Sequence, residues 1–381
     1  MKSIKIIISF IIVLTLGTPC VQATSDVLEE QKSLLNISDF IKEANQYSKE
    51  TFPDMDMGDV LNSAIKGEIN GSFWQKIISQ MLGREVTNAI RTLGIILVII
   101  VIHSVLKSIS DGLENKGVSQ IIYYVEYILI VTLIMTSFSE MMVITKDTIE
   151  KLVGFMNSLV PILITLMITT GSIVTANVVQ PVILFIIGFI GNAISVFVLP
   201  FVMVSAVLGI ISNISDKVQI GKLSKYFKSG VGWFLGVVLT IFVGVVSIEG
   251  TLSSSVDGIT AKATKAAVSN FIPIVGKILG DAVDTVLGCA AVLKNAVGIV
   301  GVLVVIGICI MPIIRLAVLT IAYHLATAIC EIIADDKIVK VLEQMASSFK
   351  ILLGALFSVS TMLIIGVTLV VKISNSGLMY R

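Results

Sequence analysis

The sequence predicts an all-α, polytopic helical membrane protein of about seven to nine spans, with a short acidic helical segment outside the membrane near its N-terminus. Hydrophobic residues make up 55% of the 381 residues and charged residues only 14%. The mean hydropathy of +0.99 is far above that of soluble domains. Apolar runs approaching the roughly 20 residues of a membrane helix recur along the chain, and a lysine-rich connection between two of them predicts the orientation.

Residues 1–23, MKSIKIIISFIIVLTLGTPCVQA, are predicted to be a secretory signal peptide. Lys2 and Lys5 precede the apolar core 6–16, and the small residues before position 24 suit a cleavage site. An uncleaved anchor is the alternative, although the apolar core is short for a span. Residues 24–89 follow as an acidic extracytoplasmic segment. Its apolar residues recur at helical spacing within 57–83, which predicts helices that pack on the rest of the chain or, less favourably, on a partner.

Residues 90–250 and 292–381 are predicted to hold the transmembrane helices. Between Lys151 and Asp216 the chain has 64 residues without one charge. That stretch, 152–215, is long enough for three spans, or for two spans with a re-entrant piece, broken near Gly171 and around Pro200. The clearest candidate spans elsewhere are 92–106, 121–144, 229–248, 295–314, 316–333 and 351–371.

The connection SDKVQIGKLSKYFKSG carries four lysines against one aspartate, which places it in the cytoplasm. With the mature N-terminus outside, this favours three spans in the uncharged stretch and about nine in all. Arg315, between two apolar runs, is expected in a loop. Cys289, Cys309 and Cys330 lie in apolar surroundings without the spacing of metal ligands, so we expect small buried core residues.

Residues 251–291 are predicted to be an extracytoplasmic linker followed by an amphipathic helix that starts at Pro273. In NFIPIVGKILGDAVDTVLG, spacing by four places charged and small residues on one side of that helix. This candidate functional face comprises Gly276, Lys277, Gly280, Asp281, Asp284 and Gly288. Two placements fit: a solvated face at the membrane surface, or a face turned toward a water-filled cavity or a neighbouring helix.

A second pattern is a line of small residues at spacing four: Gly232, Gly236, Thr240 and Gly244. Small side chains on one face allow another helix to come close. Packing within the same chain is the favoured interpretation, and self-association is the alternative.

No motif for chemistry is found. IGKLSK and VGKILG lack the residues of a phosphate-binding loop, and the two histidines are isolated from any H-E-x-x-H or catalytic arrangement. The net charge of +1 gives no basic stripe for nucleic acid. We therefore expect a protein that is not an enzyme, without a cofactor or metal and without a nucleic-acid partner.

Three stretches resemble the stage III sporulation protein AE family of endospore-forming bacteria. They are QPVILFIIGFIGNAISVFVLPFVMVSAVLGIIS, GVVSIEGTLSSSVDGIT, and DGITAKATKAAVSNFIPIVGKILGDAVDTVLGCAAVLKNAVGIVG. The resemblance extends over nearly the whole chain in its order of spans.

This resemblance implies a multi-pass protein of the mother-cell membrane around the forespore, required for late forespore gene expression. It implies partners among the other stage III A proteins, including a cytoplasmic secretion-type ATPase and ring-forming proteins, and the forespore protein stage II Q. The first hypothesis is thus a non-enzymatic subunit of a channel or secretion-type complex. The alternative is a stand-alone secondary transporter that uses Asp281 and Asp284 for a coupling cation.

Overall fold

The computed structural model describes residues 25–49, 51–53, 55–68, 116–214, 220–245, 276–332 and 336–379, with seven isolated positions between 87 and 105. Every regular element in this part of the chain is helical, which confirms the all-α class. The predicted signal peptide and most of the predicted linker lie outside the described residues.

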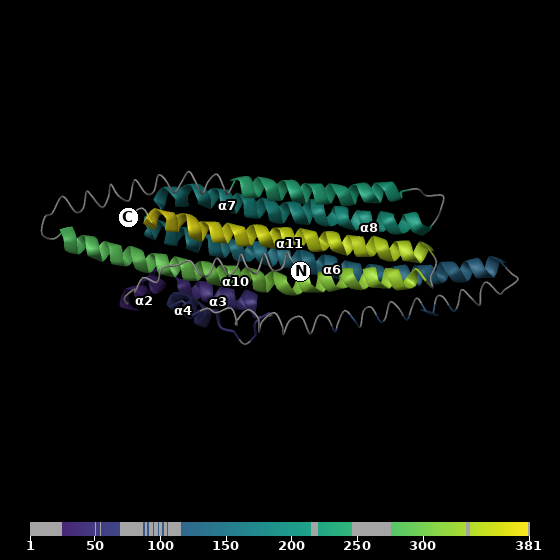
Figure 1. The fold of residues 1–381 in the computed structure, drawn as a ribbon, viewed down its shortest axis with the longest axis horizontal. Coiled ribbons are helices and arrows are strands. Elements are labelled where there is room, and N and C mark those ends of the chain that lie inside the picture. Colours follow the sequence, from purple (N-terminus) through teal and green to yellow (C-terminus); the bar gives the residue numbers. More distant parts are fainter. Residues whose placement is uncertain are drawn as a thin grey trace.

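Long helices lie side by side along the axis of an elongated bundle, and three short helices gather against one of them near one end (Figure 1). The short helices are α2 (Ser25–Leu34), α3 (Ile37–Ser48) and α4 (Met57–Lys66). The long elements are α6 (Lys116–Thr169), α7 (Ile173–Ala193), the π-helical turn η1 (Ile194–Val198), α8 (Leu199–Ile214), the helix Gly221–Val245, α10 (Gly276–Cys330) and α11 (Asp336–Met379).

The break expected near Gly171 is confirmed. This glycine has a φ of 84°, a left-handed conformation that costs glycine little, and it turns the chain from α6 into α7. The break expected around Pro200 is wrong. Pro200 is the second residue of α8, and the wider turn of η1 directly precedes it. A π-turn relaxes the hydrogen-bonding pattern that a proline would otherwise disrupt, so the helical path continues.

Arg315 also differs from expectation, because it lies inside α10 and not in a loop. Its guanidinium Nη2 lies 2.7 Å from Oε1 of Glu140 on α6. A charge that is paired between two helices need not end a helix. The predicted spans 295–314 and 316–333 therefore lie, as far as Cys330, in one continuous helix.

Five helical stretches in the described residues are long and apolar enough to cross a membrane, which indicates a membrane location. They are Tyr127–Thr169, Ile173–Asn213, Gly221–Val245, Thr285–Cys330 and Asp336–Lys372. Four of them have 37 to 46 residues, well above the roughly 20 that one crossing needs. Seven to nine spans therefore stays a prediction.

The core runs along the bundle axis and is almost entirely apolar. One aromatic group joins three long helices: the ring of Phe349 on α11 lies 5.7 Å from that of Phe138 on α6 and 5.0 Å from that of Tyr323 on α10, measured between centroids. Cys289, Cys309 and Cys330 are buried within this core, as expected. These contacts fix the heights of α6, α10 and α11 relative to one another.

Candidate functional site

The predicted acidic segment folds locally through recognisable helix signals. Asp56 caps α4, its carboxylate accepting a hydrogen bond from the backbone N–H of Gly58 at 2.6 Å, and Gly67 ends that helix with a φ of 72°. Asn45 of α3 accepts a hydrogen bond from the N–H of Met57, which ties the two helices together. The apolar stripe of α4, including Val60 and Leu61, is buried, so it packs on its own chain as predicted.

Helices α2 to α4 lie along one half of α10. At one end of this contact the side-chain amide of Gln31 donates to the carbonyl of Val286 at 3.0 Å. At the other end the Thr51 hydroxyl donates to the carbonyl of Gly307 at 2.7 Å, and the buried ring of Phe52 covers the same glycine. Gly307 is required there because a Cβ would lie 2.8 Å from that ring.

Of the short helices, α3 also contacts α6. The Ser158 hydroxyl donates to the Glu43 carboxylate at 2.6 Å, and Phe155 packs edge-on against Tyr47, with ring centroids 5.6 Å apart. Burial, together with the Glu43 carboxylate, raises the pKa of the Tyr47 phenol. The phenol is therefore neutral at physiological pH, which suits its position against an apolar ring.

Beside this contact, α6 carries a charged stripe. We use that name for Glu140, Lys146, Asp147, Glu150 and Lys151 on α6 together with Arg315 on α10. Lys146 pairs with Glu150 at 3.7 Å and Asp147 with Lys151 at 3.1 Å. Their side chains are 37% to 60% exposed, and such exposed pairs contribute little stability. The charged stripe is of interest because of its height along the bundle.

That position follows from contacts at the two ends of the uncharged run 351–371 of α11. Phe138, just before the stripe, meets Phe349. Beyond the stripe, Leu159 lies against Gly301 of α10, and nearby Gly298 lies against Val371. The stripe therefore lies beside 351–371 of α11, a run of 21 uncharged residues between Lys350 and Lys372. This run is about 30 Å long, the thickness of the bilayer core.

The outer faces of α2 to α4 continue this polar character. The exposed charged side chains on and directly next to these helices are Glu29, Glu30, Asp39, Lys42, Lys49, Asp56, Asp59, Lys66 and Glu68. We call these residues and the charged stripe together the polar side of the bundle. By contrast, α7 exposes large apolar side chains, with Phe185 71% and Phe189 48% exposed. Gly191 of α7 contacts Val153 of α6, so the polar and apolar surfaces lie at similar heights.

Two polar features were missed in the sequence. Lys294 of α10 is fully buried, between the two contacts of α10 with the short helices. The sequence signal that could have identified it is that Lys294 is the only charged residue in the apolar run 285–314. Ionisable groups inside a membrane bundle are costly and mark functional positions.

The second missed feature is a buried polar cluster of Ser205 on α8, Ser224 on the helix Gly221–Val245, and Gln344 on α11. Each serine hydroxyl donates to the other serine's carbonyl, at 2.8 and 2.7 Å. The Gln344 amide donates to the Ser205 carbonyl and the Ser224 hydroxyl, at 3.1 and 2.7 Å. Lys228 donates to the Gln344 carbonyl at 3.0 Å. Single serines and a glutamine have no sequence pattern that would have identified this cluster.

The predicted functional face is only partly described. Its helix exists: the described part runs from Gly276 without interruption to Cys330. The predicted start at Pro273 lies outside the described residues. Gly288 is partly exposed, whereas the side chains of 276–284, which include Lys277, Asp281 and Asp284, lie outside the described part. The role of this face stays a prediction.

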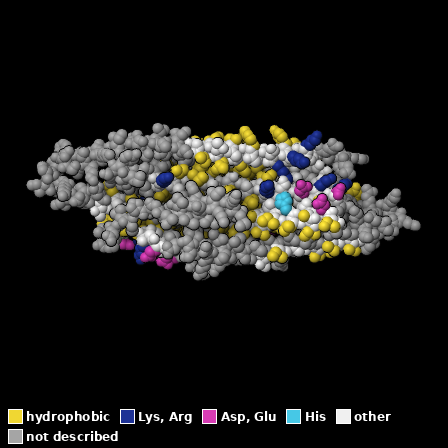
Figure 2. Space-filling model, in the orientation of Figure 1, with side chains coloured by type: hydrophobic (Ala, Val, Ile, Leu, Met, Phe, Trp, Pro, Cys, Tyr) yellow, Lys and Arg dark blue, Asp and Glu magenta, His cyan; other side chains and the backbone are white. Residues whose placement is uncertain are grey.

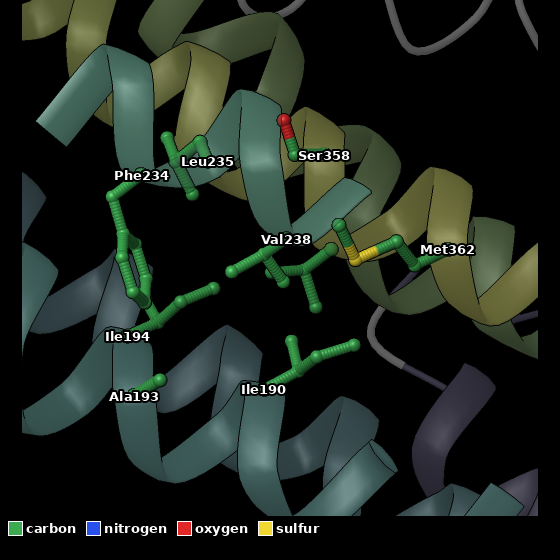
Figure 3. A pocket seen from close by; sticks show the side chains of 9 residues that line it. Ile190, Ala193, Ile194, Phe234, Leu235, Val238, Ser358 and Met362 are labelled. Carbon is green, nitrogen blue, oxygen red and sulfur yellow. The ribbon is translucent and has the colours of Figure 1, made fainter. Parts of the chain in front are cut away.

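The predicted small-residue line is on the surface. Gly232, Gly236 and Gly244 are exposed, and nothing lies within 4 Å of where a Cβ would be. The nearby pocket between α7, η1, this helix and α11 is apolar, with Leu235, Val238 and Met362 among its lining residues (Figure 3). The Ser358 hydroxyl at its edge already donates to the Gly354 carbonyl. The pocket therefore offers helix packing and not a polar binding site.

Comparison with known proteins identifies the family. Residues 55–374 match the family described as Stage III sporulation protein AE. The chain is 30% identical over 308 residues to "Stage III sporulation protein AE" of Bacillus subtilis (strain 168), covering 81% of this chain and 77% of that protein. No solved structure matches, and neither match indicates an enzyme family. The chain therefore belongs to the stage III sporulation protein AE family.

Proposed function

We propose that this protein is a non-enzymatic membrane subunit of a channel or secretion-type complex between mother cell and forespore, and that its polar side faces an aqueous path. The observation that carries the proposal is the height of the charged stripe. If 351–371 of α11 crosses the bilayer, the stripe lies within the same slab. Exposed charges at that depth are stable only where they meet water or protein.

The remaining parts of the proposal rest on family membership. The protein acts in the mother-cell membrane around the forespore, together with the other stage III A proteins. A cytoplasmic secretion-type ATPase supplies the energy, and ring-forming proteins extend the conduit. The transporter that uses Asp281 and Asp284 is the second candidate. Substrate-coupled flux by the purified chain alone would favour that transporter, whereas co-purification with the ATPase and ring proteins without such flux favours the complex.

Cysteine accessibility tests the aqueous path directly. In a background without reactive native thiols, Lys146→Cys and Glu150→Cys are expected to react with a membrane-impermeant maleimide in the assembled membrane complex. Phe185→Cys and Phe189→Cys on α7 are expected to stay unlabelled, because a thiol in lipid is not ionised. Lys42→Cys on the outer face of α3 is the positive control. Labelling of Lys42→Cys without labelling of either stripe position would refute a water-facing stripe.

The acidic helix face has its own prediction. Asp281→Asn combined with Asp284→Asn is expected to impair the formation of heat-resistant spores while the protein still inserts into the membrane at normal amounts. The reason is that spacing places both carboxylates with glycines on one side of α10. Asp281→Glu combined with Asp284→Glu, which keeps both carboxylates, is the matched control and should sporulate normally. Normal sporulation of the first double variant would instead indicate a merely solvated face.

A further inference from the structure

Two helices that are distant in the sequence present lysines at the same end of the bundle. Lys222 and Lys225 open the helix Gly221–Val245, and Lys340 lies in the second turn of α11; all three are exposed. The contact of 2.7 Å between the Gln344 amide and the Ser224 hydroxyl holds the two helices together at this point. We call these three lysines the basic patch. Figure 2 shows basic side chains gathered over this end, with acidic ones beside them.

Within the described residues, none of the three ammonium groups has an ion-pair partner. The acidic side chains described at this end are Glu331, Asp336 and Glu343, and further lysines are Lys228 and Lys337. Lys228 is already engaged with the carbonyl of Gln344. The basic patch therefore has hydrogen-bond donors and positive charge that the described chain does not satisfy.

On both helices the charged residues end at a similar height along the bundle. Lys228 is the last charged residue before the uncharged run 229–245, and Lys350 is the last before 351–371. These two lysines follow the Ser224 and Gln344 contact by four and six residues, or about 6 and 9 Å along the helices. Leu235 and Met362, farther along, line one pocket, so the two uncharged runs continue side by side (Figure 3).

Aromatic side chains mark this height as well. Tyr226 is 75% exposed and Trp233 is 72% exposed, although both are large and amphipathic. Lysines followed by tyrosine and tryptophan and then by an uncharged helix are typical of the boundary between lipid headgroups and hydrocarbon. Beyond that boundary the same helix exposes Ile241 and Val243, which suits contact with acyl chains.

We propose that Lys222, Lys225 and Lys340 bind the headgroups of anionic phospholipids, with Tyr226 and Trp233 at the headgroup level. Lysines close to a membrane surface attract acidic lipids through their charge. The continuity of the basic patch with exposed aromatic and aliphatic side chains favours a lipid over an acidic protein segment, which would satisfy the lysines and leave the apolar surface uncovered.

Trp233 provides the probe. The chain has two tryptophans, so Trp74→Phe leaves Trp233 as the sole tryptophan, whose emission can be excited selectively. Bromine quenches a tryptophan that it contacts. The full-length protein is therefore reconstituted into two kinds of bilayer, both made of phosphatidylglycerol and phosphatidylcholine. In one kind only the phosphatidylglycerol is brominated, and in the other only the phosphatidylcholine. We expect the quenching to show that phosphatidylglycerol is preferred about fivefold over phosphatidylcholine next to Trp233. This advantage should fall in high salt.

Replacing the three lysines of the basic patch by glutamine is expected to reduce the advantage to about one, and replacing them by arginine to retain it. Lys42→Gln, Lys49→Gln and Lys66→Gln together, on the outer faces of α3 and α4, form the control and should leave it unchanged. Equal quenching by the two lipids in the unaltered patch overturns the proposal, whether or not the glutamine variant folds. An advantage that survives in a folded glutamine variant also overturns it.

Discussion

Replacement of Gly307 by leucine is expected to detach α2 to α4 from α10 and to abolish sporulation. The leucine Cβ would lie 2.8 Å from the Phe52 ring, and its branches would displace both this ring and Thr51, which donates to the Gly307 carbonyl. Exposing a buried phenylalanine costs about 1.5–3 kcal/mol, and overpacking costs about 1–3 kcal/mol. Retention of the short helices on α10 should therefore weaken by several kcal/mol.

The measurement is limited proteolysis of the purified full-length protein, followed by the rate of cleavage within 25–68. A leucine at Gly354 of α11 is the matched control, since no atom lies within 4 Å of its Cβ position. The control should keep the slow cleavage of the natural protein. If the Gly307 variant is cleaved just as slowly and still supports spore formation, the contact between the short helices and α10 is not needed for function.

Replacement of Gly209 by leucine is expected to break the polar cluster that joins α8, the helix Gly221–Val245 and α11. The Gln344 side chain lies directly over the α-carbon of Gly209, so that even a methyl group would collide with it. Moving Gln344 removes its hydrogen bonds to Ser205 and Ser224, each a net contribution of about 0.5–1.5 kcal/mol. Overpacking adds about 1–3 kcal/mol, so we expect a total destabilisation of about 2–6 kcal/mol.

Thermal unfolding of the detergent-solubilised protein measures this effect, and Gly236→Leu provides the control on an open helix face. Leucine is a better helix former than glycine by nearly 1 kcal/mol, so the control should be neutral or slightly stabilised. A Gly209 variant that unfolds at the same temperature as the control would mean that Gln344 has an equally good alternative conformation.

Several parts of the fold could be predicted because their causes are local. Hydropathy predicted a helical membrane protein, since a long apolar run can satisfy its backbone in lipid only as a helix or a closed barrel. Gly171 predicted the turn between α6 and α7, and helical spacing predicted the buried stripe with Val60 and Leu61. The three buried cysteines were equally evident from their apolar neighbours.

The errors concern residues whose effect depends on a distant partner. Arg315 is expected in a loop because a charge interrupts an apolar run, yet it lies within α10 and pairs at the surface of the bundle with Glu140, 175 residues away. Pro200 was expected to break the chain, but the π-turn before it preserves the helical path. The local sequence shows that such a residue disfavours a continuous helix, but it does not show the distant or structural feature that offsets this effect.

Hydropathy and composition are enough to recognise a helical membrane protein, and three characteristic stretches indicate its family. The packing of the helices shows which of their heights coincide, and therefore that the charged stripe of α6 lies at the height of the uncharged run of α11. It also shows that Lys294 is buried and that Ser205, Ser224 and Gln344 meet. The physical reason is that hydropathy is a property of each segment, whereas the polarity of a bundle's sides depends on how its helices are aligned and rotated against one another.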